Sequence, residues 1–367
     1  MGDGQLLAPE QLRACAIAFY LPQFYPIPEN DKAWGEGFTE WVNVRNAKPL
    51  FHNHEQPKIP TELGYYSLED PTVQIKQAQL AKEYGISGFA YWYYWMGYGK
   101  RLLEKPLDSM LNNPKVDIPF CLAWANESWT GVWHGRPDQP IAIQRYGDDD
   151  EIKLHAETLA NYMQDPRYIK VNSKPIFLVY KPFKLPSQYL NRLRHFLKER
   201  GITIYAIAIA NELFDWQKRG YDALNINLLG VIRAGSATDL GNRIIWGIRR
   251  RFVPTHSVRK ISYASYARCF ARNTEILKRP GIIPTCVPNW DNSPRCGKAS
   301  LVLTNSNPEL YGQHLNECIK TVEGKKESKK LVFIKSWNEW AEGNYLEPDQ
   351  KHGRQYLEMT KDVLSNG

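Results

Sequence analysis

The sequence predicts an α/β fold of the (β/α)8 type, a TIM barrel with long loop insertions after strands 1 and 6. Three observations predict it. The chain contains eight short apolar runs, amphipathic helical patterns lie between most of them, and the runs are continuous instead of alternating. Continuous runs are typical of parallel strands that are covered on both faces, and eight such units fit one closed barrel. The predicted strands are residues 15–21, 86–92, 119–124, 175–180, 203–209, 223–228, 282–287 and 331–336.

Helical periodicity fills three of the connections between these runs. Residues 71–84 alternate apolar and polar positions in helical spacing and end at Gly85, and residues 185–200 end at Gly201 in the same way. Residues 309–322 form a third pattern. A glycine directly after a helical pattern is a common stop signal, so we expect helices over these three ranges.

The composition fits one large domain in a reducing compartment. The chain is 43% apolar, has no run long enough to span a membrane, and lacks the basic and apolar start of a signal peptide. None of its six cysteines is in a CxxC spacing, which argues against zinc and against a disulfide framework. No linker or repeat divides the chain. We therefore expect a cytoplasmic protein with a single domain over residues 1–367 and a flexible tail of about 12 residues at its start.

Positive charge is concentrated in one segment. The formal net charge is +8, and eleven Lys and Arg residues against two acids lie between Arg233 and Arg279. A solvated basic helix is the simplest interpretation. The alternative is contact with an acidic polysaccharide, or peripheral contact with the inner membrane face through the segment from Arg243 to Lys260. No nucleic-acid-binding motif accompanies the charge, so we do not expect nucleic acid as a partner.

Acidic and aromatic groups follow the carboxyl ends of several predicted strands. In chain order they are Glu40 with Trp41, the five rings Tyr91 to Trp95, Asn126-Glu127, Asn211-Glu212, Asp291 and Asn338-Glu339. All strands of a barrel point the same way, so these groups should converge on one rim. That rim is where barrel enzymes place their chemistry.

The stretch 331–349, LVFIKSWNEWAEGNYLEPD, carries the densest group of such residues. A short buried strand runs directly into Trp337, Asn338, Glu339 and Trp340, and Glu342 follows. Two crowded carboxyl groups push their pKa values apart, and burial raises the pKa of the one that must stay protonated. Cleavage of a glycosidic bond needs such a pair, and indole rings can stack on sugars. A solvated acidic loop with two packing tryptophans is the alternative.

The other groups have structural alternatives too. Tyr91 to Trp95 could be mainly core and rim packing, and Asp291 with Arg295 could be an ion pair that shapes its loop. For Glu212 we prefer the interpretation that it begins a helix and favours the helix dipole. The histidines show no ligand-like spacing, so no metal is expected. Neither a phosphate-binding glycine loop nor a GxSxG motif is present, so no nucleotide cofactor is expected.

On these motifs the chain resembles the WbsX-type domain, which is related to glycoside hydrolase family 99. The resemblance rests on YLPQFYPIPENDKAWGEGFTEW, CLAWANESWT, WDNSPR and KSWNEWAEGNYLEPD, in that order. It implies a (β/α)8 barrel without a metal. Family 99 enzymes are endo-acting α-mannosidases and α-mannanases that retain configuration, and their substrate's own 2-hydroxyl is thought to attack the anomeric carbon. Carried over by position, Glu339 would be the base that assists this hydroxyl, and Glu342 the acid/base for the departing group.

Two features keep other functions open. Ala341 stands where family 99 has His, and the WbsX branch is also described as glycosyltransferase in lipopolysaccharide, O-antigen or capsule biosynthesis. A transferase would need a diphosphate site, for which Arg249 to Arg251 is the candidate. A non-catalytic glycan-binding barrel is the second alternative.

We therefore expect a glycosidase-like enzyme that acts on a glycosidic bond of a cell-surface polysaccharide or oligosaccharide, without a cofactor. Glu339 and Glu342 are the predicted catalytic residues. The predicted substrate-binding residues are Glu40, Trp41, Tyr91, Trp92, Trp124, Asn126, Glu127, Trp129, Asp291, Arg295, Asn338 and Trp340.

Overall fold

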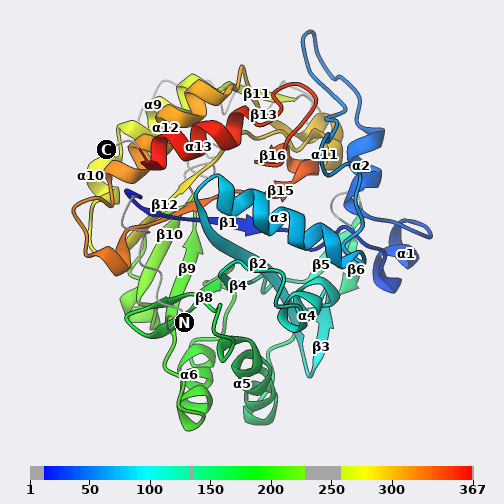
Figure 1. Cartoon of the computed structure of the whole chain (residues 1–367). Helices are drawn as coiled ribbons and strands as arrows, with labels where there is room; N and C mark the ends of the chain where they lie inside the picture. Colours follow the sequence, from blue (N-terminus) through cyan, green and yellow to red (C-terminus); the bar gives the residue numbers. More distant parts are fainter. Residues whose placement is uncertain (1–11, 132–135, 228–257, 366–367) are drawn as a thin grey trace, which may run out of the picture.

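The computed structural model describes residues 12–131, 136–227 and 258–365, and these residues form the expected barrel (Figure 1). Its eight strands are all parallel and pair in the order β1-β14-β12-β10-β9-β8-β4-β2, and β2 pairs back to β1 and closes the sheet. Ile17 is aligned with Phe333 on one side and with Gly88 on the other. The strands are β1 Cys15–Tyr20, β2 Ile86–Gly97, β4 Phe120–Trp124, β8 Lys174–Val179, β9 Tyr205–Ala210, β10 Ala223–Ile226, β12 Ile282–Cys286 and β14 Leu331–Ile334.

All eight predicted strands are confirmed, most within two residues of their expected ends. The exception is β2, which continues five residues beyond the predicted end at residue 92 because its last part forms an antiparallel hairpin with β3, Lys100–Leu102. Every residue of β1, β4 and β12 is buried. This burial explains the continuous apolar runs, since both faces of each strand are covered.

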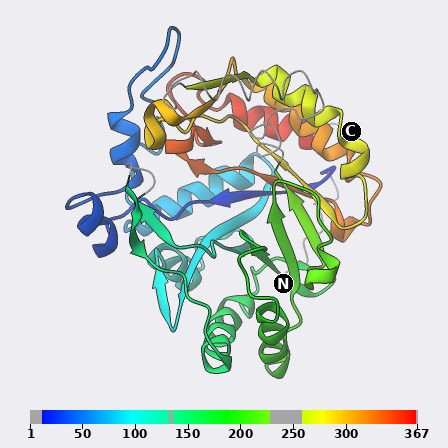
Figure 2. The ribbon, with the colours of Figure 1, turned by 180° about the vertical axis from the view of Figure 1, so that it is seen from behind.

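Helices surround the barrel, as Figures 1 and 2 show. The helices α5 and α6 lie together on one side, and α9, α12 and α13 cover the opposite side. In the described part of the chain, the connection from β9 to β10 contains only a short 3-10 turn. The surrounding helices are α3 Pro71–Glu83, α4 Lys105–Asn112, α5 Asp149–Met163, α6 Tyr189–Glu199, α9 Tyr263–Ala271, α10 Thr274–Leu277, α12 Pro308–Lys320 and α13 Gln355–Ser365.

The three predicted helices are confirmed as α3, α6 and α12. The α3 helix begins where the Asp70 side chain accepts a hydrogen bond from the backbone N–H of Thr72 at 2.9 Å, and α12 begins where the side chain of Asn307 accepts from Leu310 at 2.8 Å. Such caps satisfy N–H groups that have no partner within the helix. By contrast, the expectation of a helix at Glu212 is wrong, because this residue lies exposed in a bend where no helix begins.

Both predicted insertions shape the carboxyl-end rim. The first, between β1 and α3, contains α1 Pro28–Trp34 and α2 Glu40–Asn46; the sixth connection contains β11 Arg259–Ser262, followed by α9. Shorter elements complete the rim: β5 Trp129–Gly131, β6 Arg136–Ala142, α11 Ser293–Cys296, β13 Leu301–Thr304, β15 Asn338–Glu339 and β16 Asn344–Tyr345. The short strand β7 Lys170–Val171 lies at the other end of the barrel, where it pairs with the start of β8.

Some expectations fall outside the described residues. The N-terminal tail lies mainly in residues 1–11, and most of the basic segment that starts at Arg243, including Arg249 to Arg251, lies in residues 228–257. The single domain over residues 1–367 stays a prediction. Within the described ranges, every helix is too short or too polar to cross a bilayer.

Candidate active site

A cavity of about 340 Å³ opens at the carboxyl ends of the barrel strands. Its walls come from the segments that follow β1, β4, β8, β12 and β14 and from the last part of β2. Seven of the fourteen residues predicted for the site line it: Glu40, Trp92, Glu127, Trp129, Arg295, Glu339 and Glu342. Residues more than 300 positions apart therefore meet at one place.

The two predicted catalytic residues lie on a tight hairpin directly after β14. The backbone N–H of Trp337 donates to the carbonyl of Phe19 at 2.7 Å, which fixes the start of the hairpin to the end of β1. The short strands β15 and β16 then pair in antiparallel fashion. Gly343 closes the turn between them with a φ of +60°, a conformation that favours glycine. The hairpin is thus held rigidly at the barrel rim.

Glu339 is buried at the bottom of the cavity, with 4% of its surface exposed. Its Oε1 accepts a hydrogen bond from the indole N–H of Trp92 at 2.6 Å. Its Oε2 lies 3.4 Å from Nδ2 of Asn344 and 3.7 Å from the ammonium group of Lys335. One oxygen is therefore fixed by the cavity wall, and the other faces the second carboxylate and a cation.

Glu342 has a matching arrangement. Its Oε1 accepts from Nη1 of Arg295 at 2.7 Å, and its Oε2 lies 3.4 Å from Nδ2 of Asn344 and 3.6 Å from the Lys335 ammonium. Because the two glutamates share the same amide and the same ammonium, they form a close pair. Arg295 also binds Glu40 through Nε at 2.7 Å and through Nη2.

Burial and charge set the protonation of this group. Burial raises the pKa of Glu339 to about 7; the Lys335 ammonium opposes the rise, and the neighbouring Glu342 adds to it. Burial acts to lower the pKa of Lys335, but Glu339 and Glu342 outweigh it and raise that pKa. Burial also raises the pKa of Glu40, against the effect of Arg295. The site therefore contains a carboxyl that can exchange a proton near neutral pH beside permanent cations.

Aromatic rings form much of the remaining wall. Trp129 packs edge-on against Tyr94 with 5.1 Å between ring centroids, and Trp92 packs edge-on against Tyr180 at 5.3 Å. Glu127 lies nearby, with its Oε2 3.8 Å from the ammonium of Lys181. Rings that surround a few fixed polar groups are typical of a small-molecule or sugar site.

Three of the predicted tryptophans and one tyrosine do not reach this cavity. Trp124 is fully buried and donates to the carbonyl of Trp95 at 2.9 Å. Trp41 donates to the carbonyl of Tyr66 at 2.7 Å. Trp340 stacks on Tyr345 at 3.8 Å between centroids, and Tyr91 packs at 4.4 Å from the Tyr20 ring. These four rings pack inside the wall, and a direct substrate contact by any of them stays a prediction.

Asn126, Asn338 and Asp291 also lie outside the cavity lining. Asn126 accepts from the backbone N–H of Lys181 at 2.7 Å and donates to its carbonyl at 3.0 Å. Asn338 makes the same pair of bonds with Leu21, at 2.7 and 3.0 Å. Both asparagines therefore fasten one rim loop to another.

Asp291 does not pair with Arg295, contrary to the structural alternative raised for these two residues. Its Oδ2 accepts from His54 at 2.8 Å and from Gln56 at 2.7 Å, while Arg295 turns to the glutamates. Burial acts to raise the pKa of Asp291, but the hydrogen bonds from His54 and Ser293 outweigh it and lower that pKa.

Sequence reasoning missed Lys335, Asn344 and Tyr180, and it did not single out Tyr94 within the run of rings from Tyr91 to Trp95. In the sequence Lys335 is simply a lysine that flanks a strand, although its position between β14 and the Trp-Asn-Glu motif was a usable signal. It places an ammonium where the rim begins. Asn344 follows Glu342 by two residues. It gave no chemical signal of its own, because its role depends on the hairpin.

One group in the described residues offers several metal-binding atoms. The ligand atoms of Cys286, His314 and Cys318 lie within 4.8 Å of one another, between β12 and α12 and outside the cavity lining. His314 Nδ1 lies 3.2 Å from the Tyr263 hydroxyl and 3.5 Å from the Cys286 sulfur. Burial raises the pKa of Cys318, whereas a metal ligand must be a thiolate. The cluster is therefore explained as a buried hydrogen-bonded group.

Comparisons with known proteins show the family of the chain. The family model for glycosyltransferase WbsX matches residues 16–360. Uncharacterized protein WxcX from two strains of Xanthomonas campestris pv. campestris is 36% identical over 363 residues, which are 97% of this chain and 50% of the relative. The chain thus spans about half the length of these curated relatives.

Similar solved structures share the barrel. One is the GH99 endo-alpha-mannosidase from Bacteroides thetaiotaomicron in complex with bis-tris propane. The superposition covers 95% of this chain and 95% of that one, with a TM-score of 0.60 and 16% sequence identity. Another is a glycoside hydrolase-like protein. Its superposition covers 96% of this chain and 94% of that protein's chain, with a TM-score of 0.59 and 15% sequence identity. At such identities the likeness establishes the fold.

Proposed function

The chain belongs to the glycosyltransferase WbsX family, and from this membership we propose that it is a carbohydrate-active enzyme that cleaves a glycosidic bond with Glu339 and Glu342. One observation carries the proposal: two buried glutamates share the ammonium of Lys335 at 3.7 and 3.6 Å inside a cavity walled by aromatic rings. A retaining glycosidase needs two neighbouring carboxyl groups with distinct proton affinities.

In the proposed first step, Glu339 takes the proton from a substrate hydroxyl next to the anomeric carbon. The freed oxygen bonds to that carbon, and Glu342 donates a proton to the departing oxygen as the glycosidic bond breaks. A pKa of about 7 makes Glu339 a stronger base than an exposed carboxylate at neutral pH. The product of this step is a strained anhydro sugar.

In the second step, water opens this sugar. Glu342, now ionised, takes a proton from the water as its oxygen bonds to the anomeric carbon, and Glu339 returns its proton to the substrate oxygen. Two inversions at one carbon retain its configuration. Lys335 is nearly equidistant from both glutamates, so it can stabilise the negative charge on either one as the charge moves between them.

The test is a cleavage assay on a panel of bacterial surface polysaccharides and oligosaccharides, with detection of new reducing ends. Wild-type protein should release product, while Glu339→Gln and Glu342→Gln should each lower kcat by about 10²- to 10⁴-fold. A control, Glu199→Gln on the exposed end of α6, should cleave normally. Unchanged hydrolysis by either cavity variant would refute the catalytic roles of these two glutamates.

Glycosyl transfer is the second candidate, and it is supported by the description of the family as glycosyltransferase. Calorimetry with nucleoside diphosphate sugars separates the two: strong binding, together with product formation only when a sugar nucleotide is present, would favour transfer. A glycan-binding barrel without activity would bind the glycan with no product, and both glutamine variants would bind it equally well. We keep the cytoplasm, and peripheral contact with the inner membrane face, as proposals for its location.

A further inference from the structure

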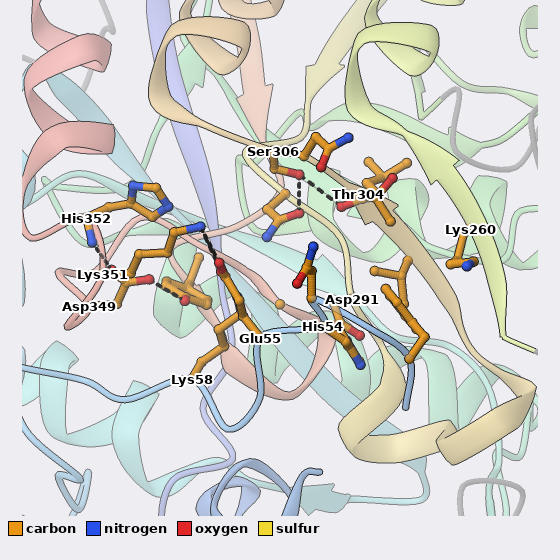
Figure 3. Close-up of a pocket in the computed structure, with 18 of the residues that line it drawn as sticks. His54, Glu55, Lys58, Lys260, Asp291, Thr304, Ser306, Asp349, Lys351 and His352 are labelled. Carbon is orange, nitrogen blue, oxygen red and sulfur yellow. Dashed lines mark hydrogen bonds and ion pairs between the residues drawn. The ribbon is translucent and has the colours of Figure 1, made fainter. Parts of the chain in front are cut away.

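Figure 3 shows a second cavity, of about 390 Å³. Gly343 and Tyr345 line it, so it borders the hairpin that carries Glu342. Among the described residues it shares no lining residue with the first cavity. The partition between the two cavities is thin. The backbone N–H of Asp291 donates to the carbonyl of Glu342 at 2.7 Å, and a Cβ added to Gly343 would meet Cβ of Asp291 at 2.8 Å. The side chain of Glu342 points to Arg295 in the first cavity, so the second cavity faces the back of the hairpin.

The mouth of this cavity is cationic. Three ammonium groups line it, those of Lys58, Lys260 and Lys351, against one exposed carboxylate, that of Glu55. Lys351 donates to both oxygens of Glu55 at 2.7 Å, and Lys58 lies 3.5 Å from the same carboxylate. Lys260 stands 4.8 Å from the Phe51 ring centroid, and no ion pair joins it to the described residues.

The other two carboxylates of the lining are already satisfied and buried. Asp291 is 3% exposed and accepts from His54 and Gln56. Asp349 is 6% exposed and accepts from the hydroxyl of Tyr345 at 2.7 Å and from a backbone N–H at 2.6 Å. Local donors occupy these two carboxylates, so the groups left exposed to a ligand at the mouth are three ammonium groups against the one carboxylate of Glu55.

Part of the lining is suited to sugar hydroxyls. Thr304 and Ser306 (Figure 3), together with Asn289, contribute hydroxyl and amide groups to the cavity. Ser306 donates to the side-chain oxygen of Asn289 at 2.6 Å, and this bond fixes the amide. The rings of Phe51 and Tyr356 complete the wall. Fixed donors and acceptors beside ring faces are the usual composition of a sugar site.

We propose that this second cavity binds a negatively charged sugar unit, with Lys260 as the main contact to the charge. Two sources supply that chemistry: a uronic acid unit of an acidic polysaccharide, or the phosphate group of a sugar nucleotide. Binding in the second cavity does not depend on cleavage in the first.

The experiment is calorimetry on the full chain carrying Glu339→Gln, which prevents cleavage. The probes are a galacturonic acid oligomer, its methyl-esterified form without the charge, and UDP-glucose. We expect the acidic oligomer to bind and the ester to bind at least tenfold more weakly. Lys260→Met should weaken the acidic oligomer about tenfold, equal to about 1.4 kcal/mol, and Lys260→Glu should abolish binding. Lys198→Met, on exposed α6, is the matched control and should change nothing.

The possible results distinguish the two sources of negative charge, and they distinguish this inference from the proposed function. Binding of UDP-glucose in place of the oligomer, with the same dependence on Lys260, would assign the site to a sugar phosphate. Equal binding of acid and ester, equal binding by the Lys260 variants, or no binding of either anion would overturn the inference. Cleavage of a neutral glycan by the Lys260→Met variant of the otherwise wild-type chain should stay normal, so a negative result in the second cavity leaves the proposed function testable on its own.

Discussion

Two buried glutamates on the same hairpin, Glu339 and Glu347, have similar pKa values and different surroundings. Burial raises the pKa of each to about 7. Glu347 faces away from the cavity, and three neutral donors bind it: Gln77 at 2.6 Å, Trp340 at 2.6 Å and Tyr66 at 3.1 Å. Glu339 lines the cavity and has one short bond, from Trp92 at 2.6 Å.

The difference teaches that a raised pKa does not identify a catalytic carboxyl by itself. An ionised carboxylate offers about four lone-pair sites, and Glu347 has most of them filled by side chains that cannot move. Glu339 keeps capacity on the side that faces the cavity, next to the ammonium of Lys335 and the second carboxylate of Glu342. We therefore propose that Glu339 transfers the proton and that Glu347 positions the hairpin.

The largest expected effect is on catalysis and separates the two glutamates directly. Glu339→Gln should lower kcat by about 10²- to 10⁴-fold because a glutamine cannot accept the proton. Glu347→Gln keeps the size of the side chain and can still bind Trp340 and Tyr66, so its kcat should stay within about tenfold of wild type. The measurement is steady-state hydrolysis of whichever glycan the panel identifies. A similar fall in kcat in both variants would mean that the two glutamates do not differ in their catalytic role.

The second expected effect is on the pH dependence of the unfolding free energy. The variant Glu347→Gln isolates the part that comes from Glu347. The folded pKa of Glu347, about 7, lies above the value of 4.5 for an exposed glutamate, so the folded state holds the proton more tightly. Stability should therefore fall as pH rises from about 4.5 to about 7, by up to about 3 kcal/mol. The variant should lose this part of the pH dependence.

Urea unfolding of wild type and variant at pH 5 and pH 8 measures the difference. The control is Glu317→Gln, at the exposed surface of α12, where Glu317 binds Lys320 at 2.8 Å. Parallel curves for wild type and Glu347→Gln across this range would show that Glu347 is ionised in the folded protein at little cost.

The fold could be predicted from the sequence because burial on both faces leaves a direct mark. Each barrel strand reads as a continuous apolar run, and glycine or a capping residue marks the ends of helices such as α3 and α12. What propensity did not show was the hairpin extension of β2, because pairing with β3 depends on a turn that lies beyond the apolar run.

The candidate site was predictable only in part, and the five rings after Ile86 explain why. Trp92 and Tyr94 line the cavity, whereas Tyr93 and Trp95 face outward, where their rings lie near His155 of α5. Side chains alternate along a strand, so the position of each ring depends on the strand's exact orientation in the sheet. A run in which every residue is aromatic does not reveal that alternation. Lys335 was missed because a lysine beside a strand is common, and only the tight hairpin that follows brings Glu339 and Glu342 to 3.7 and 3.6 Å from its ammonium.

The third effect concerns Lys335, whose ammonium holds down the pKa of Glu339. Lys335→Met removes that cation and should raise this pKa further. If Glu339 acts as the base, it must be ionised, so the acid limb of the pH–activity profile should move to higher pH by about one pH unit. The control Lys198→Met should leave the profile in place.

The wild-type profile in the same experiment also tests the roles. A rate that rises with pH through about 7 fits a base with the pKa of Glu339, whereas a rate that falls through about 7 would make Glu339 the proton donor and reverse the assignment. A profile that does not move in Lys335→Met would mean that Lys335 has no part in setting this pKa.

The smallest expected effect concerns the side of the hairpin that faces away from the cavity, around Glu347. It tests whether this side does no more than position the hairpin. The hydroxyl of Tyr66 donates to Glu347 at 3.1 Å and accepts from Asn338 at 3.2 Å. Tyr66→Phe should cost about 1 kcal/mol of unfolding free energy, the usual contribution of one such hydrogen bond. Tyr65→Phe is the matched control, because the Tyr65 ring packs edge-on against the same Trp41 at 5.1 Å and is only half-buried. A fall in kcat of more than about tenfold in Tyr66→Phe, without a matching fall in stability, would mean that the Tyr66 hydroxyl affects catalysis directly and that the side of the hairpin around Glu347 does more than position it.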